Sequence, residues 1–117
     1  MLLNDDPTRL MHIIDSAQEA VGFVEGFTRN DLDGNRMLQL SLVRCLEVVG
    51  EAAARLSKPL REANPHIPWA AMIGMRNRIV HAYFDIDIDL VWKTATEDLP
   101  EIVSKIVTIL EKLREEK

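Results

Sequence analysis

A chain of 117 residues is long enough to bury one hydrophobic core but not two, so we expect a single domain over residues 1–117. Its 47% hydrophobic and 28% charged residues exclude an intrinsically disordered protein, and no apolar run of about 18 residues predicts a transmembrane helix. The net charge of −5 excludes binding to nucleic acid through overall charge, so any RNA contact requires a local basic patch. With no signal-peptide pattern and one cysteine, we expect a cytoplasmic protein that does not bind membranes.

The first half of the chain predicts two helices joined by a loop. The first has Asp6 as its N-cap candidate and Pro7 at its first helical position, and its apolar residues recur at helical spacing: Leu10, Ile13, Ile14, Ala17, Val21 and Val24. The polar segment 28–35 is expected to be a loop. A longer helix follows over about residues 36–57, with an apolar stripe of Leu38, Leu42, Cys45, Val49, Ala52 and Leu56.

The second half predicts two further main helices. Residues 58–68 contain three prolines and hold at most a short helical turn. Pro68 suits the first turn of a third helix over 69–84, and the run DIDID offers N-caps for a final helix that reaches the C-terminus. Pro100 should kink or split that helix, because proline removes a backbone hydrogen bond. In the absence of a strand pattern, we predict an all-α, antiparallel bundle of about four main helices.

The third helix carries polar residues that an ordinary core helix does not need. On a helical wheel, Arg76 lies in the middle of the apolar face. A guanidinium buried there requires a carboxylate or an opening to solvent, and we expect Glu47 or Glu51 to supply the carboxylate. His81 lies about 140° from Arg76, and Asn77 precedes it by one turn. Arg76 and His81 should flank a groove formed by the small residues Ala70, Ala71, Gly74 and Ala82.

Each polar residue taken alone has an ordinary structural explanation. His81 can stabilise a helix C-terminus, Arg76 can form a structural ion pair, and Tyr83 can be a core residue with its hydroxyl at the edge. Their combination on one helix favours a functional site. The middle third of the chain also concentrates basic residues, which can form either a phosphate-binding rim or surface ion pairs. We favour a functional role for Arg78, next to the proposed groove, and leave both readings open for Arg44, Arg55, Lys58 and Arg61.

The remaining motifs do not indicate a metal site or another nucleophile. The segment DLDGN, residues 31–35, lacks the glycine spacing and final glutamate of a calcium loop, and capping explains DIDID better. Three scattered histidines do not form a zinc pattern. Cys45 has apolar neighbours and is expected to be a core thiol. We therefore expect no metal and no cofactor.

The stretch RNRIVHAY resembles the Arg-x-x-x-x-His-x-Tyr signature of HEPN-domain proteins, specifically the HepT-like toxins. The short motif is weak alone, but the resemblance extends over about residues 8–112. It includes LEVVGEAAARLS, NPHIPWAAMIGMRNRIVHAYFDID and LVWKTATEDLP in the same order, with no departure at the motif positions.

This resemblance implies an all-helical, homodimeric, metal-independent ribonuclease that acts on RNA, with a minimal nucleotidyltransferase as its antitoxin partner. It makes Arg76 and His81 the catalytic pair and Asn77 a supporting residue. Tyr83 matches the position to which the partner is understood to attach AMP, which silences the toxin. An adenylyl group there would compete with RNA phosphate for the arginine.

The side chains suit this chemistry. A histidine can exchange a proton with the RNA near neutral pH, and an arginine can hold phosphate oxygens as negative charge builds up. Because one chain offers one suitable histidine, we expect a composite site at a dimer interface. The alternative is a non-catalytic HEPN module that binds nucleotide or docks a nucleotidyltransferase, with Arg76 in a structural role. A purely structural dimer leaves the polar residues unexplained.

Overall fold

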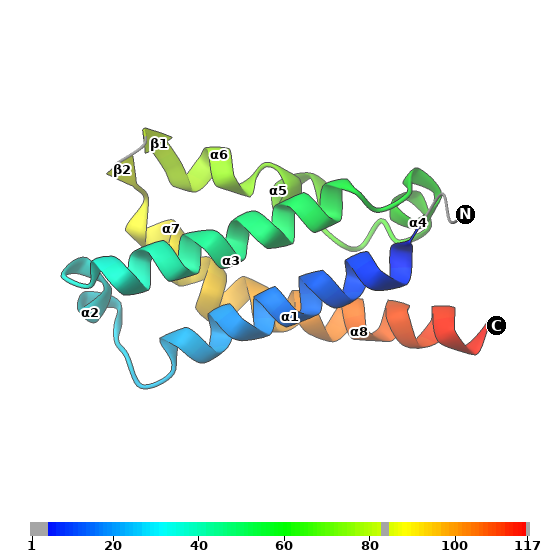
Figure 1. Cartoon of the computed structure of the whole chain (residues 1–117), viewed down its shortest axis with the longest axis horizontal. Coiled ribbons are helices and arrows are strands. Elements are labelled where there is room, and N and C mark those ends of the chain that lie inside the picture. Colours follow the sequence, from blue (N-terminus) through cyan, green and yellow to red (C-terminus); the bar gives the residue numbers. More distant parts are fainter. Residues whose placement is uncertain (1–4, 83–84, 117) are drawn as a thin grey trace.

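The computed structural model describes residues 5–82 and 85–116, and three long helices form its frame (Figure 1). They are α1 (Asp6–Val24), α3 (Arg36–Ala54) and α8 (Leu99–Glu115). Figure 1 shows α1 running antiparallel to both α3 and α8, with α5 and α6 along the other side of α3. The predicted all-α fold, of the HEPN-like type, is confirmed.

The apolar stripes predicted for the first two helices form the core. Every member of the second stripe is buried, and so is every member of the first except Val21, which is half-buried. The first helix begins one residue earlier than predicted, because the Asp5 carboxylate accepts the Thr8 N–H and caps it. Asp6 is buried instead and accepts hydrogen bonds from Ser57 N and Oγ, at 2.9 and 2.7 Å.

The segment 28–35 is not simply a loop. It contains the short helix α2 (Arg29–Asp33), where Thr28 and Asp31 form a capping box and Leu32 is fully buried. In this capping box each side chain accepts a hydrogen bond from the backbone N–H of the other residue, so N–H groups at the start of the helix gain partners. The turn predicted after the second helix is confirmed as α4 (Lys58–Ala63), capped by Ser57.

The third helix is much shorter than predicted. It consists of α5 (Trp69–Ile73) and α6 (Met75–Ile79), separated at Gly74. The chain then forms β1 (Val80–Ala82), which pairs antiparallel with β2 (Asp85–Ile86), so the prediction of a continuous helix without strands was wrong. The Asp87 N–H donates to the Ile79 carbonyl at 2.7 Å, which holds the returning chain against the helix end.

The final helical segment begins at Asp87, whose carboxylate accepts the Leu90 N–H and caps α7 (Ile88–Lys93). A π-helical segment, η1 (Thr94–Asp98), then joins α7 to α8. The predicted disturbance at Pro100 therefore takes the form of a wider turn just before the proline. Among the described residues, no helix combines the length and hydrophobicity needed to cross a bilayer.

Gly50 allows α5 to approach α3 at backbone distance. A Cβ atom at this position would lie 2.7 Å from the Met72 carbonyl oxygen, closer than real Cβ atoms approach a backbone atom. Any side chain at position 50 must therefore push the two helices apart.

We predict that Gly50→Ala lowers the free energy of unfolding by about 1–3 kcal/mol, because the added methyl overpacks a backbone contact. Gly22→Ala in α1 is the matched control, since a Cβ there meets nothing within 4 Å. This control should stabilise the helix by roughly 0.5–1 kcal/mol. Urea unfolding followed by circular dichroism measures both, and equal stability of the two variants would contradict the packing argument.

Candidate active site

Arg76 forms an ion pair with Glu47, one of the two carboxylates proposed from the sequence. The Nε atom of Arg76 donates to Glu47 Oε2 at 2.6 Å. The arginine side chain is 57% exposed, so its predicted place in the middle of the apolar face was wrong. Met72, Met75 and Ile79, spaced three and four residues apart, form the buried side of the α5–α6 segment instead.

The Arg76 side chain lies at a small hollow between α3 and the α5–α6 segment. This hollow of about 240 Å³ is also lined by Asn77, Glu51 and the small residues Gly50 and Ala54. Asn77 thus shares the hollow with Arg76. The small residues that open the hollow, Gly50 and Ala54, come from α3 rather than from the predicted set on the third helix.

His81 lies on β1 rather than on the predicted third helix, so it does not flank the groove in the way that the helical wheel predicted. Its side chain is 55% exposed, and Nε2 is 3.9 Å from Asp87 Oδ2, beyond hydrogen-bonding distance. The other oxygen of Asp87 caps α7 at 3.1 Å. His81 does not line the hollow at Arg76, although β1 follows α6 directly. The imidazole is therefore available to an external molecule.

Arg78 lies on a different side of α6 from Arg76. It lines a separate cavity between α5–α6 and the α7–α8 segment, whereas we had expected it beside the Arg76 groove. Residues two apart on a helix point about 200° apart, which accounts for this separation. Among the described residues, Arg78 has no ion-pair or hydrogen-bond partner.

The other basic residues do not gather into one rim. Arg44, Arg55 and the pair Lys58 and Arg61 line three different hollows. Glu51 and Arg55 have the spacing of a surface ion pair on one helix, but they form none within the described part of the chain. The local positive charge at the candidate site therefore comes from α6.

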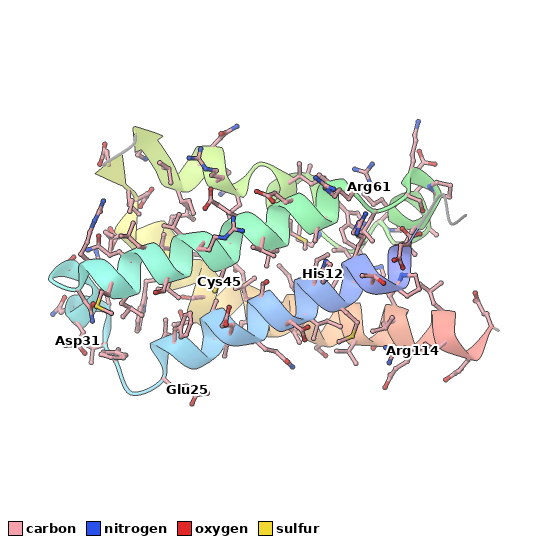
Figure 2. All side chains as sticks on the ribbon, viewed as in Figure 1. His12, Glu25, Asp31, Cys45, Arg61 and Arg114 are labelled. Atoms are coloured by element: carbon pink, nitrogen blue, oxygen red, sulfur yellow. The ribbon has the colours of Figure 1, made fainter. Side chains whose placement is uncertain are left out.

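Cys45 is a core thiol, as predicted. It is 3% exposed on the side of α3 that faces α1, and its Sγ donates to Glu19 Oε1 at 3.5 Å (Figure 2). Burial, together with this hydrogen bond, raises the pKa of the thiol to about 12. The neutral thiol is a poor nucleophile at neutral pH. In the described ranges, no group of three or more His, Cys, Asp or Glu residues is arranged to hold a metal ion.

Tyr83, the proposed modification site, lies outside the described residues. Sequence reasoning missed Asp87, which joins the β1–β2 turn to α7 and lies nearest the imidazole. The sequence indicated Asp87 only as one of several aspartates in DIDID that could cap the following helix.

Comparison with known proteins identifies the family to which the chain belongs. The family model "Ribonuclease HepT-like" matches residues 13–109. The chain is 36% identical over 97 residues to "Putative RNase MJ1380" of Methanocaldococcus jannaschii, covering 83% of this chain and 89% of that protein. It is 34% identical over 106 residues to "Putative RNase MJ0125" of the same organism, covering 91% of each.

A third relative, "Probable ribonuclease HepT" of Thermococcus cleftensis, is 35% identical over 105 residues, covering 86% of this chain and 92% of that protein. No solved structure gives a significant match. The fold and sequence define a helical protein of the HEPN type. The chain belongs to the HepT-like ribonuclease family.

Proposed function

We propose that this protein is an endoribonuclease that cuts single-stranded RNA without a metal ion. The observation that carries the proposal is the exposed Arg76, which Glu47 holds through Nε alone. Among the described residues, nothing occupies the two terminal nitrogens of this guanidinium. They can bind two phosphate oxygens in parallel, the geometry that arginine offers to phosphate. Family membership supports RNA as the substrate.

His81 acts in this proposal as the group that transfers protons. The imidazole takes the proton of an RNA 2′-hydroxyl, the 2′-oxygen forms a bond to the adjacent phosphorus, and the bond from phosphorus to the 5′-oxygen breaks. The leaving 5′-oxygen then receives a proton. Arg76 stabilises the negative charge that builds on the phosphate oxygens, and Asn77 offers an amide in the same hollow.

The need for a second proton-transfer group leads us to propose a homodimer with a shared cleft. The exposed side of α3 supports this, because Met37 and Leu40 lie there at helical spacing from Glu47 and are 81% and 49% exposed. A second copy that covered these side chains would gain apolar burial and bring two Arg76–His81 sets together.

The family resemblance further leads us to propose a toxin of a toxin–antitoxin pair in the cytoplasm. Its antitoxin would be a nucleotidyltransferase that adds AMP to Tyr83. In the chain, Tyr83 is two residues after His81, so an adenylyl group would add bulk and negative charge close to the proposed site. Arg78 is not part of the Arg76 hollow.

A second candidate function is a non-catalytic module that binds nucleotide or docks a nucleotidyltransferase. The observation that favours this second function is the Glu47–Arg76 ion pair, because the pair joins α3 to α6 and gives Arg76 a structural role. The two functions differ in whether RNA is cut.

We predict that the purified protein cuts a labelled single-stranded RNA in excess chelator. Arg76→Ala should slow cutting by about 10²–10³-fold through loss of charge stabilisation, and His81→Ala by about 10²–10⁴-fold through loss of proton transfer. Both side chains are exposed, so the free energy of unfolding of each variant should lie within about 1 kcal/mol of the wild-type value.

Arg114→Ala, which removes a cation near the end of α8, is the matched control and should cut at the wild-type rate (Figure 2). Absence of cutting by every form would favour the binding module. Equal cutting by all forms would indicate a contaminating nuclease and remove the support for this site.

Mixing His81→Ala with wild-type protomers tests the composite site. If the shared cleft needs a histidine from each protomer, subunit exchange should lower the cleavage rate below the mean of the two unmixed proteins, because the mixed dimer contains one intact histidine instead of two. Cleavage rates are measured before and after exchange, together with mass by light scattering. A monomer that cuts RNA at full rate would contradict the shared cleft.

Tyr83→Phe tests the proposed switch. The variant should still cut RNA. It should take up no AMP when incubated with ATP and the proposed nucleotidyltransferase antitoxin, because phenylalanine lacks the accepting hydroxyl. Intact-protein mass spectrometry detects the added group. Equal AMP uptake by wild type and Tyr83→Phe would place the modification elsewhere.

A further inference from the structure

A second cavity lies on the side of α6 opposite the Arg76 hollow. It has a volume of about 470 Å³ and is enclosed by the loop before α5, by α5–α6 and by the α7–α8 segment. This volume falls within the usual range for small-molecule sites. The proposed ribonuclease chemistry does not use this cavity.

The lining combines an apolar floor with a basic rim. Met72, Met75 and Ile102 are buried side chains of the floor. Arg78, Lys93 and Lys105 supply three positive charges against the two carboxylates of Asp98 and Glu101. Those carboxylates already pair with the two lysines, at 3.1 and 3.0 Å, whereas Arg78 pairs with no other described residue. The cavity therefore favours an anion with an apolar portion.

Thr94 gives this cavity a polar group that no described residue satisfies. It lies in η1, is 1% exposed and lines the cavity. The hydroxyls of Thr96 and Thr108 each donate to the carbonyl four residues earlier, at 2.7 and 3.2 Å. Among the described residues, Thr94 makes no such bond. The Thr94 hydroxyl is therefore free to bond to a molecule in the cavity, and π-helical segments are frequent at functional sites.

We propose that this cavity holds one unpaired nucleotide of the RNA, with its phosphate on Arg78 and its base against Met72, Met75 and Ile102. Unpaired bases are commonly taken up by apolar or aromatic surfaces and read through hydrogen bonds to their edges. The Thr94 hydroxyl is the group that reads the base edge. A fatty acid is disfavoured, because the cavity also contains four ionised side chains arranged as two ion pairs.

This assignment rests on the proposed ribonuclease function and deepens it. The helix α6 has five residues, a length of about 7.5 Å, and it presents Arg76 to one hollow and Arg78 to the other. A single strand of RNA that crosses this helix can contact both arginines. The nucleotide in the cavity would then set the position of the scissile phosphate and the sequence preference.

Methionine-methyl NMR tests the proposal without relying on cleavage. The His81→Ala protein, labelled at its methionine methyl groups, is titrated with a short single-stranded RNA and separately with AMP and UMP. RNA should shift the Met72 and Met75 signals in a saturable way and leave the signal of Met11, on α1 outside the cavity, unchanged. Arg78→Ala should weaken this binding at least tenfold, about the effect of one charge-assisted hydrogen bond.

Thr94→Val, which keeps the shape and removes the hydroxyl, should weaken binding about threefold or more. Arg114→Ala is the control: it changes the charge as Arg78→Ala does, but it lies nine residues beyond Lys105, the last cavity residue of α8. This variant should change RNA binding less than twofold. Thr94→Val also tests the site if Arg78→Ala fails to fold.

Three results would overturn the proposal: no shift of Met72 and Met75 with any ligand, unchanged binding in both cavity variants, or binding of AMP and UMP without binding of RNA. The last result would identify a site for free nucleotides. A wild-type protein that cuts RNA while these methyl signals stay fixed would refute the cavity assignment alone. Shifts with RNA in a protein that does not cut it would refute the catalytic proposal alone.

Discussion

The close approach of α5 to α3 at Gly50 is the constraint on which the candidate site depends. Only a residue without Cβ leaves room for the Met72 carbonyl at that distance. Glu47 lies one turn before Gly50 on α3, and Arg76 lies one turn after Met72 along the chain. The contact therefore brings α6 within reach of Glu47, and the 2.6 Å ion pair follows from it.

The buried side of the α5–α6 segment then determines how the polar residues are distributed. Met75 and Ile79 of α6 cover the core, and the two arginines line separate hollows. An acidic protein thus places two cations on one short helix, and among the described residues Arg78, unlike Arg76, pairs with no carboxylate. This meets the requirement that an acidic chain binds RNA through a local positive surface.

The junction after α6 depends on Asp87. Its N–H binds the Ile79 carbonyl, one carboxylate oxygen caps α7, and the other lies nearest His81. One residue therefore ends a helix, begins another and contributes negative charge near the imidazole. The π-helical segment η1 follows α7, and its residues Thr94 and Asp98 line the second cavity. The wider turn before Pro100 therefore forms part of the wall of the proposed nucleotide site.

The sequence alone determined the long helices and the buried faces of the first two, because a stripe repeated over several turns specifies which side is apolar. It also proposed Glu47 or Glu51 as the partner for Arg76, identified Cys45 as a core thiol, and contained motifs that indicated the family. Only the tertiary structure decided where the third helix ends and which hollow each arginine faces. Helices of five residues have little periodic signal, and their phase depends on contacts with distant residues such as Gly50 and Asp87.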